Sequence, residues 1–283
     1  FFFVAMLRIY PLINRSINNL QMLEFCRKSV EFHKRLSKFI KLKKLNNFTD
    51  NSEKEIFNNN KENILSLKNL NFSYESKKIF KNLNVAFKDN SIIGIEGESG
   101  DGKTTLVEIL LGLIEPQKGH LLINNIDIKK HRDEWFKNVS YVSQDNTLFN
   151  GSILQNITFQ LEDKKNDKFE VLKLIKNLNK NFYNKFKNKI NYTINYSASN
   201  LSLGEKQRIS IARGLFKGKR IIVLDEITSS LDRENERQVL DEIKKFKRNR
   251  LIIIISHKRS SFKICDKIYR IKDLGLKKVK FHD

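Results

Sequence analysis

The chain has 283 residues, which is enough for one large domain or two small ones with a sizeable core. Its hydrophobic content of 40% and charged content of 30% are ordinary for a globular protein, and two prolines and 11 glycines exclude a collagen-like or low-complexity chain. Cys26 and Cys265 lie far apart, so the sequence shows neither a metal-binding cysteine spacing nor a disulfide framework.

The formal net charge of +22 allows three interpretations. A basic surface collects the phosphates of nucleic acid. It also binds an anionic membrane surface. A coding bias toward Lys, Asn and Ile would charge every loop without a purpose, and the run KNLNKNFYNKFKNKINY at residues 176–192 fits this third interpretation best. The charge alone therefore does not identify a partner.

Residues 1–42 are predicted to be helical. Apolar residues recur there at helical spacing, at Ile13, Ile17, Leu20 and Leu23. Basic residues become frequent after them.

The first apolar run, FFFVAML, is far shorter than the roughly 20 residues that span a bilayer. It lacks the basic region and the cleavage site of a secretory signal. We therefore expect the sequence to be the C-terminal part of a longer protein. Residues 43–63 are polar and without periodicity, which predicts a linker to a domain over residues 64–283.

Within this domain, strand-like runs alternate with helix-like runs. The strand-like runs are residues 64–74, 91–97, 120–128, 139–144, 220–226 and 250–257. The helix-like runs are residues 103–114, 163–190, 205–216 and 234–246. Continuous apolar strands that alternate with helices predict a parallel sheet covered on both faces.

A glycine-rich loop follows the second strand-like run. It fits the pattern G-x-x-x-x-G-K-[ST] at every fixed position, with Gly97, Glu98, Ser99, Gly100, Asp101, Gly102, Lys103 and Thr104. The glycines let consecutive N–H groups point at phosphate oxygens, and the following helix adds its positive end. Lys103 supplies a charge for the β- and γ-phosphates, and Thr104 supplies a hydroxyl for Mg²⁺. A chance match is disfavoured because a strand precedes the loop and an apolar helix follows it.

Two carboxylates end the strand RIIVLDE. Burying such a strand is costly unless something uses Asp225 and Glu226. Asp225 is placed to hold Mg²⁺ through water, and Glu226 is placed to orient or deprotonate an attacking water. The alternative, a pair of surface acids at a strand end, loses weight beside the phosphate loop.

With these two motifs, residues 64–275 resemble an ATP-binding cassette of the ABC transporters, with the elements in family order. The resemblance implies the α/β fold of a P-loop NTPase. It implies a mainly parallel core sheet, an antiparallel β subdomain and a helical subdomain that carries the signature, here preceded by an N-terminal helix. It also implies that the chain hydrolyses ATP with Mg²⁺ as cofactor.

The resemblance also assigns site residues. It implies catalytic roles for Lys103, Glu226 and His257, the last in IIIISHK, where the family has a histidine at the γ-phosphate. The implied nucleotide-binding set adds Tyr74 against the adenine, the loop residues above, Thr105, Gln144, Ser202, Gly204 and Asp232. The implied Mg²⁺ set is Thr104, Gln144 and Asp225. Asp232 ends SSLD, which resembles the family's loop at the dimer contact.

The signature segment, LSLGEKQR at residues 201–208, departs from the family pattern Leu-Ser-Gly-Gly-Gln at Leu203 and Glu205. Ser202 and Gly204 remain, and in the family these two contact the γ-phosphate of ATP held by the opposite cassette. Ser202 and Glu205 also have the spacing of a helix capping box. A carboxylate near the triphosphate is expected to weaken ATP binding and slow turnover.

Three features favour an exporter. The segment QDNTLFNGSILQNITF resembles the exporter version of the stretch after the glutamine, and a helix and linker precede the cassette. The stretch FFFVAMLRIYPLINRSINNLQ resembles the cytosolic end of a last membrane helix that leads into the cassette, so we expect residues 1–42 to be that end. Its texture also resembles the branch that flips lipid-linked oligosaccharides. The expected partners are a second cassette, in a homodimer or a heterodimer, and a transmembrane domain mostly outside this sequence. The expected location is the cytoplasmic face of the plasma (inner) membrane.

Two other classes stay open. The chain is alternatively the cassette subunit of an importer. It is alternatively a soluble cassette ATPase that acts on nucleic acid, although that class would need a long coiled-coil insertion or a second cassette, and nucleic acid is not an expected partner.

Overall fold

The computed structural model describes residues 56–57, 62–75, 77–98, 100–145, 147–160, 166–194 and 200–279. They belong to one compact unit, Glu55–Asp283. The predicted N-terminal helix and most of the predicted linker lie outside the described residues.

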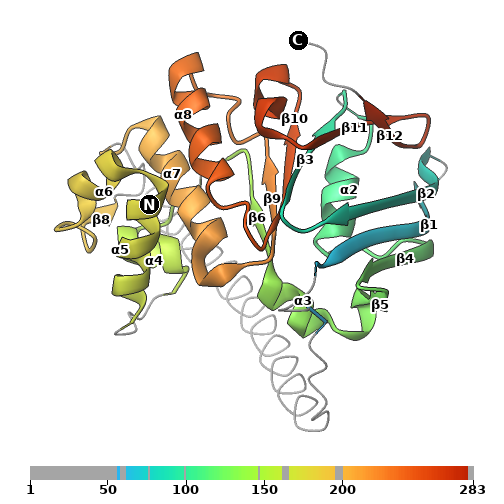
Figure 1. The fold of residues 1–283 in the computed structure, drawn as a ribbon, viewed down its shortest axis with the longest axis horizontal. Coiled ribbons are helices and arrows are strands. Elements are labelled where there is room, and N and C mark those ends of the chain that lie inside the picture. The colour runs from blue at the N-terminus through green and yellow to red at the C-terminus, as the bar shows by residue number, and fades with distance from the viewer. Residues whose placement is uncertain are drawn as a thin grey trace, which may run out of the picture. The chain divides into compact units, whose positions relative to one another are not determined.

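A six-stranded sheet forms the centre of this unit, with the strand order β12-β11-β3-β10-β9-β6 (Figure 1). Its strands are β3 (Ser91–Glu96), β6 (Val139–Val142), β9 (Ile221–Asp225), β10 (Leu251–Ser256), β11 (Lys267–Lys272) and β12 (Gly275–Val279). All neighbouring strands are parallel except β12, which is antiparallel to β11. The carboxyl ends of β3, β9 and β10 therefore meet at one edge, where Ser256 pairs with Glu96 and Ile255 pairs with Asp225.

Alternate residues of these strands pack into two different cores, because successive side chains of a strand point to opposite faces. One core lies on the side of α2 (Lys103–Leu110) and takes in Ile93, Ile95, Val223, Ile253 and Ile255. The other lies on the side of α7 (Leu203–Leu215) and α8 (Arg233–Lys244) and takes in Ile92, Ile222, Leu224, Ile252 and Ile254. Burial on both faces explains the unbroken apolar run of β10.

An antiparallel sheet packs beside α2, with the order β2-β1-β4-β5 (Figure 1). It consists of β1 (Ile64–Tyr74), β2 (Lys77–Lys88), β4 (Lys118–Ile123) and β5 (Ile126–Asp127). Asn124 and Asn125 join β4 to β5 with φ values of 52° and 66°. Two successive residues with positive φ make the tight turn that matches strand twist, and asparagine tolerates this conformation.

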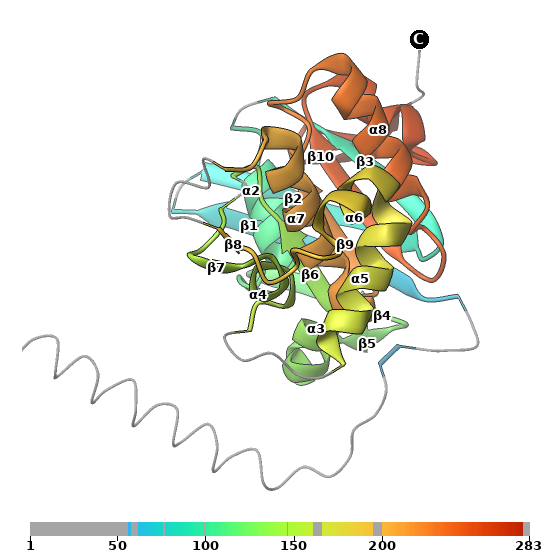
Figure 2. The same cartoon turned by 90° about the vertical axis from the view of Figure 1, so that its left-hand side faces the viewer.

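A helical subdomain lies on the other side of the parallel sheet (Figures 1 and 2). It contains α4 (Ile153–Thr158), α5 (Asp167–Leu178), α6 (Lys180–Phe186) and α7, with a small sheet of β7 (Gly151–Ser152) and β8 (Thr193–Ile194). Polar side chains fix the helix starts: Ser152 and Gln155 form a capping box on α4, and Asn179 caps α6.

The predicted fold is therefore confirmed in its three parts: a mainly parallel sheet, an antiparallel sheet and a helical subdomain. One detail of the prediction is wrong, because the strand-like run at residues 120–128 is two strands with a turn between them. The sequence pattern also missed β2, β11, β12 and α3 (Arg132–Asn138).

Two residues of the predicted linker pack into the unit. Ile56 and Phe57 are buried, and Phe57 stacks on Trp135 with 6.1 Å between the ring centroids. The Asn124 side chain donates a hydrogen bond to the Ile56 carbonyl at 3.0 Å. The segment directly before β1 is thus part of the compact unit.

None of the helices in the described ranges is both long and apolar enough to cross a bilayer.

Candidate nucleotide site

The glycine-rich loop connects β3 to α2 and depends on two of its glycines. Gly100 and Gly102 have φ values of 89° and 101°, which residues with a Cβ rarely adopt. A Cβ on Gly102 would also lie 2.5 Å from Cγ2 of Ile79 in β2. The loop therefore needs glycine at Gly102 for its conformation and for its close approach to the antiparallel sheet.

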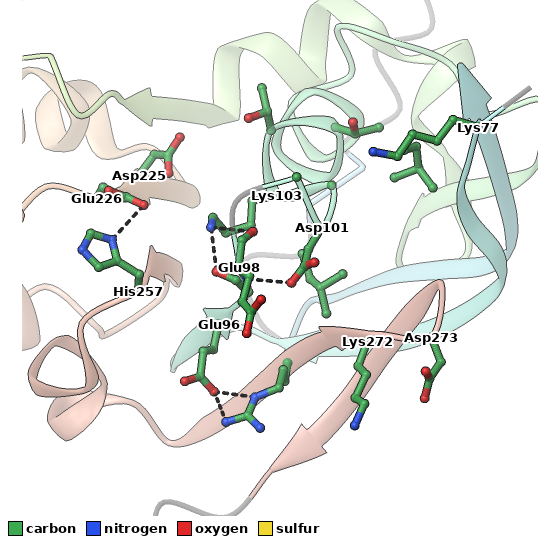
Figure 3. A pocket seen from close by; sticks show the side chains of 18 of the residues that line it. Lys77, Glu96, Glu98, Asp101, Lys103, Asp225, Glu226, His257, Lys272 and Asp273 are labelled. Carbon is green, nitrogen blue, oxygen red and sulfur yellow. Dashed lines mark hydrogen bonds and ion pairs between the residues drawn. The ribbon is translucent and has the colours of Figure 1, made fainter. Parts of the chain in front are cut away.

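The loop is braced by its own polar groups (Figure 3). Nζ of Lys103 donates to the carbonyls of Gly97 at 2.6 Å and Glu98 at 3.0 Å, and the Glu98 N–H donates to Oδ2 of Asp101 at 2.6 Å. Gly102 precedes α2 without a side-chain cap, so the first N–H groups of the helix have no capping side chain. Such a helix start binds anions.

The acidic strand end lies at the same edge of the sheet. Glu226 follows β9, and its positive φ of 48° and the hydrogen bond from its N–H to the Ile255 carbonyl, at 2.9 Å, turn the chain there. His257 follows β10, the neighbouring strand. Nδ1 of His257 lies 3.1 Å from Oε1 of Glu226, so the two predicted catalytic residues touch (Figure 3).

Asp225 has a partner that the sequence pattern did not reveal. Tyr141 in β6 donates its hydroxyl to Oδ2 of Asp225 at 2.9 Å. Burial raises the pKa of Asp225, and the hydrogen bond from Tyr141 opposes this. Burial, together with the nearby Asp225 charge, also raises the pKa of Tyr141, so the phenol stays a donor.

The loop, the acidic strand end and the histidine enclose one cavity of about 1100 Å³. That volume lies slightly above the range of about 300–1,000 Å³ that is typical of small-molecule pockets. The cavity brings together these predicted site residues: Tyr74, Gly97, Glu98, Gly100, Asp101, Gly102, Lys103, Thr104, Thr105, Gln144, Asp225, Glu226 and His257. Ser99 lies outside the described residues.

Charged residues that the motifs did not predict also line this cavity. They are Lys77, Glu96, Arg259, Arg270, Lys272 and Asp273. Arg270 pairs with Glu96 through its Nε at 2.8 Å and its Nη2 at 2.6 Å, because β11 runs beside β3 with these residues in register. No local motif announces this pair, since strand register alone brings the two residues together.

Tyr74 lies at the rim of the cavity. Its ring is half-exposed and packs edge-on against Phe72, with 4.9 Å between the centroids. Its hydroxyl donates to Oε2 of Glu108 at 3.3 Å. An exposed aromatic ring at a pocket rim is suited to stack on a nucleobase.

The signature segment does not line the cavity. The predicted capping box is present: Glu205 N–H donates to Oγ of Ser202 at 3.3 Å, and Ser202 N–H donates to Oε2 of Glu205 at 3.0 Å. Nζ of Lys185 lies 2.5 Å from the other oxygen, Oε1. Both oxygens of Glu205 are therefore engaged within the chain, and the Lys185 cation opposes the carboxylate charge, so we expect a smaller weakening of ATP binding than the sequence alone implies.

Asp232 also caps a helix rather than lining the cavity. Its Oδ1 accepts from the N–H groups of Glu234 at 3.1 Å and Asn235 at 2.9 Å, at the start of α8. The hydrogen bonds from Asn235 lower the pKa of Asp232. Ser202, Gly204 and Asp232 thus stand apart from the other predicted site residues.

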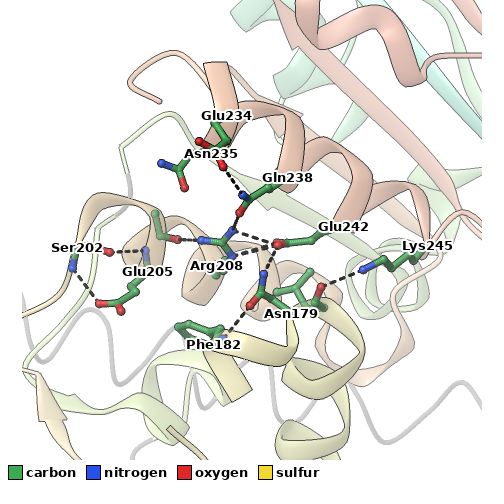
Figure 4. A network of polar contacts seen from close by, with 12 residues as sticks. Asn179, Phe182, Ser202, Glu205, Arg208, Glu234, Asn235, Gln238, Glu242 and Lys245 are labelled. Atoms are coloured by element: carbon green, nitrogen blue, oxygen red, sulfur yellow. Dashed lines mark hydrogen bonds and ion pairs between the residues drawn. The ribbon is translucent and has the colours of Figure 1, made fainter. Parts of the chain in front are cut away.

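A buried network of polar side chains connects α7, the helix that starts within the signature segment, to α8 (Figure 4). Arg208 in α7 pairs with Glu242 in α8, and it also donates to the Gly204 carbonyl at 3.3 Å. Glu242 accepts a further hydrogen bond from Asn179, the residue that caps α6. One carboxylate therefore joins three helices.

Comparison with known proteins decides the family. A sequence-family model described as ABC transporter matches residues 80–229, more than half of the chain. The chain belongs to the ABC transporter family. The cavity gathers most of the residues that the family resemblance assigns to the nucleotide.

The relatives are longer proteins. The chain is 34% identical over 215 residues to a probable ABC transporter ATP-binding/permease protein of Haemophilus influenzae, covering 74% of this chain and 38% of the relative. It is 37% identical over 216 residues to a putative export ATP-binding/permease protein of Rickettsia typhi, covering 74% and 37%. The chain thus spans less than two fifths of the length of these relatives.

A solved structure, that of a bacterial Atm1-family ABC exporter with ATP bound, superposes with a TM-score of 0.67 at 27% identity. The match covers 77% of this chain and 38% of the exporter chain.

Proposed function

We propose that this cassette hydrolyses ATP and thereby drives export across a membrane. One observation carries the proposal: the contact between Glu226 and His257 opens on the same cavity as Lys103 and the free start of α2. A phosphate-binding end and a proton-accepting end in one cavity are the two parts that phosphoryl transfer to water requires.

The residues of the chain divide the chemistry between them. Lys103 and the loop N–H groups bind the phosphate tail of ATP and stabilise its negative charge. Glu226 orients a water molecule and accepts its proton, while His257 fixes the Glu226 carboxylate from the neighbouring strand. Tyr74 stacks on the base at the rim of the cavity.

The donor set fits Mg²⁺. The Thr104 hydroxyl, the Gln144 side-chain amide and the Asp225 carboxylate all line the cavity, and Mg²⁺ prefers such oxygen ligands. When bound, the ion would neutralise charge on the phosphate oxygens. Tyr141 holds the Asp225 carboxyl from the side of β6.

Phosphate release from Mg-ATP tests the enzymatic part. The chain should release phosphate, while Lys103→Ala should lose nucleotide binding and Glu226→Gln should bind nucleotide but not turn it over. Glu170→Gln, an exposed acid-to-amide change on α5, is the matched control and should behave as the unaltered chain. Equal release by the chain and Glu226→Gln would refute the role of Glu226.

A second copy of the cassette completes the site in our proposal. Ser202, Gly204 and Asp232 lie outside the cavity, yet the family resemblance assigns them to ATP held by the opposite cassette. We infer a head-to-tail pair, either a homodimer or a heterodimer, that closes on ATP. Glu226→Gln with Mg-ATP should therefore give a dimer in light scattering, and a persistent monomer would contradict composite sites.

The direction of transport and the membrane location are likewise proposals. The names of the relatives favour an exporter over an importer subunit or a nucleic-acid ATPase. We propose residues 1–42 as the cytosolic end of the last transmembrane helix, residues 43–63 as a linker whose Ile56 and Phe57 pack into the compact unit, and residues 64–283 as the cassette on the cytoplasmic face. The resemblance to oligosaccharide flippases concerns residues 1–21, outside the described residues, and stays a prediction.

The gene provides the test. A longer reading frame with several apolar spans of about 20 residues ahead of Phe1 would support the exporter. A frame in which a separate gene supplies the membrane helices would favour the importer subunit.

A further inference from the structure

A buried carboxylate, that of Glu236, lies within hydrogen-bond distance of the segments that follow Glu226 and His257. Glu236, in the first turn of α8, is 6% exposed. Its Oε1 is within hydrogen-bond distance of three hydroxyls: Ser260 at 2.8 Å, Thr228 at 3.2 Å and Ser261 at 3.3 Å. A buried carboxylate is costly unless polar groups satisfy it, and here hydroxyls from the segment after β9 and from the 3-10 helix Arg259–Ile264 do so.

The hydroxyl protons can be placed without conflict. Thr228 and Ser261 lie 2.9 Å apart, and Ser256 donates to Ser261 at 3.2 Å. Each hydroxyl has one proton to donate. Ser256 can donate to Ser261, Ser261 to Thr228, and both Thr228 and Ser260 to Glu236. Glu236 is thus the terminal acceptor of this hydroxyl cluster.

The cluster joins the two segments that carry the catalytic pair. Thr228 lies two residues after Glu226, whereas Ser256 directly precedes His257. Lys258 adds two bridges, since its N–H donates to Ser256 at 3.0 Å and its Nζ donates to the Thr228 carbonyl at 3.0 Å. The segments before and after the histidine are therefore both fastened to the segment after the glutamate.

We propose that Glu236 is a positioning residue that sets the distance between Glu226 and His257 by holding their segments through this hydroxyl cluster. The proposal rests on the proposed ATP hydrolysis. Glu236 itself lies outside the residues that line the cavity and acts through the hydroxyls. Asp232 caps the same helix α8, so the cap and the anchoring Glu236 lie within one turn of each other.

A matched pair of variants at Thr228 tests this role. Thr228→Val keeps the shape and removes the hydroxyl, whereas Thr228→Ser keeps the hydroxyl. Thr228→Val should lower kcat by about 10- to 100-fold, because a misplacement of about 1 Å can cost 10²-fold in rate. Its KM for ATP should stay within about twofold, and Thr228→Ser should retain most of the kcat.

A second variant guards against misfolding of the first. Ser260 is only partly buried, so Ser260→Ala removes the closest hydroxyl from Glu236 with little loss of packing. It should show the same fall in kcat at nearly constant KM. A fall in kcat that is equal in Thr228→Val and Thr228→Ser, or wild-type kcat in both hydroxyl-removing variants, would overturn the proposal.

Hydrogen exchange of the backbone amides gives a readout that needs no turnover. Residues 256–262 should exchange faster in Thr228→Val and Ser260→Ala than in Thr228→Ser or the unaltered chain. If the unaltered chain releases no more phosphate than Lys103→Ala, the proposed ATP hydrolysis is wrong. Hydrogen exchange then still tests whether the hydroxyl cluster anchors residues 256–262. Unchanged exchange at residues 256–262 in both hydroxyl-removing variants would overturn the anchoring role of Glu236.

Discussion

The pair formed by Arg208 and Glu242 offers a quantitative test of how the signature helix is held (Figure 4). Their side chains are 9% and 5% exposed. Nε of Arg208 lies 3.2 and 3.1 Å from the two carboxylate oxygens, and Nη2 lies 3.1 Å from Oε1. Asn179 donates to the same Oε1 at 2.5 Å.

Glu242→Leu removes the anion and leaves a buried guanidinium behind. Breaking such a pair on one side costs about 3–5 kcal/mol of the free energy of unfolding. For a unit of the size of Glu55–Asp283 this corresponds to a fall of about 6–20 °C in Tm, at about 2–4 °C per kcal/mol. Arg208→Met combined with Glu242→Leu removes both charges, so the double variant should be more stable than Glu242→Leu alone.

Thermal and urea unfolding, followed by circular dichroism, measure the free energy of unfolding of four proteins: the unaltered chain, Arg208→Met, Glu242→Leu and the double variant. Glu170→Gln, exposed on α5, is the control and should change the free energy of unfolding by less than about 0.5 kcal/mol. Our reasoning would be refuted if the losses of the two single variants simply added in the double variant. Additivity would mean that the two groups do not depend on each other despite their burial.

Three further predictions concern the loops. Asp232→Asn keeps a capping side chain but loses the charge whose pKa the cap lowers, so Tm should fall at pH 7, and the difference should shrink as the pH falls below the ordinary aspartate pKa of 3.8. Gly102→Ala should abolish ATP binding in calorimetry, because its Cβ would meet Ile79 and its φ would cost about 1–3 kcal/mol. Glu205→Gln should leave the Kd for ATP within about twofold, because its carboxylate already caps α7.

Each of these has a clear contradicting outcome. If the difference in Tm between Asp232→Asn and the unaltered chain grew as the pH fell, the first prediction would be wrong. A group with a lowered pKa contributes stability that is lost on acidification, so the difference must shrink. Wild-type ATP affinity in Gly102→Ala would show that the loop has room to shift. A large gain in ATP affinity in Glu205→Gln would show that the carboxylate reaches the triphosphate.

The strength of the sequence signal differs between strands for a physical reason. β9 and β10 are buried on both faces, so their apolar runs are continuous and were predicted almost to the residue. In contrast, β2 and β12 place exposed lysines among their apolar residues, which leaves a weak strand signal. The turn at Asn124 and Asn125 was missed because the apolar residues on both sides of it resemble one continuous strand.

The site shows the same division. The phosphate loop and the acids at Asp225 and Glu226 were predicted from local sequence, because each depends on neighbouring residues along the chain. His257 was predicted only through the family resemblance, and the structure brings all of these residues to one cavity. The loop needs glycines at fixed spacing, and an apolar strand ending in two acids is unusual by itself. For the same reason the capping box of Ser202 and Glu205 was predicted correctly from its spacing.

Contacts between distant segments were decided only by the tertiary structure. Tyr141 reaches Asp225 across 84 positions because β6 pairs with β9. Glu236 meets its hydroxyls because α8 packs on the segment after His257. A sequence motif reflects the geometric requirements of one stretch of chain, so it can be recognised in the sequence. Strand register and helix packing result from the burial of the whole core, so no single position in the sequence reveals them.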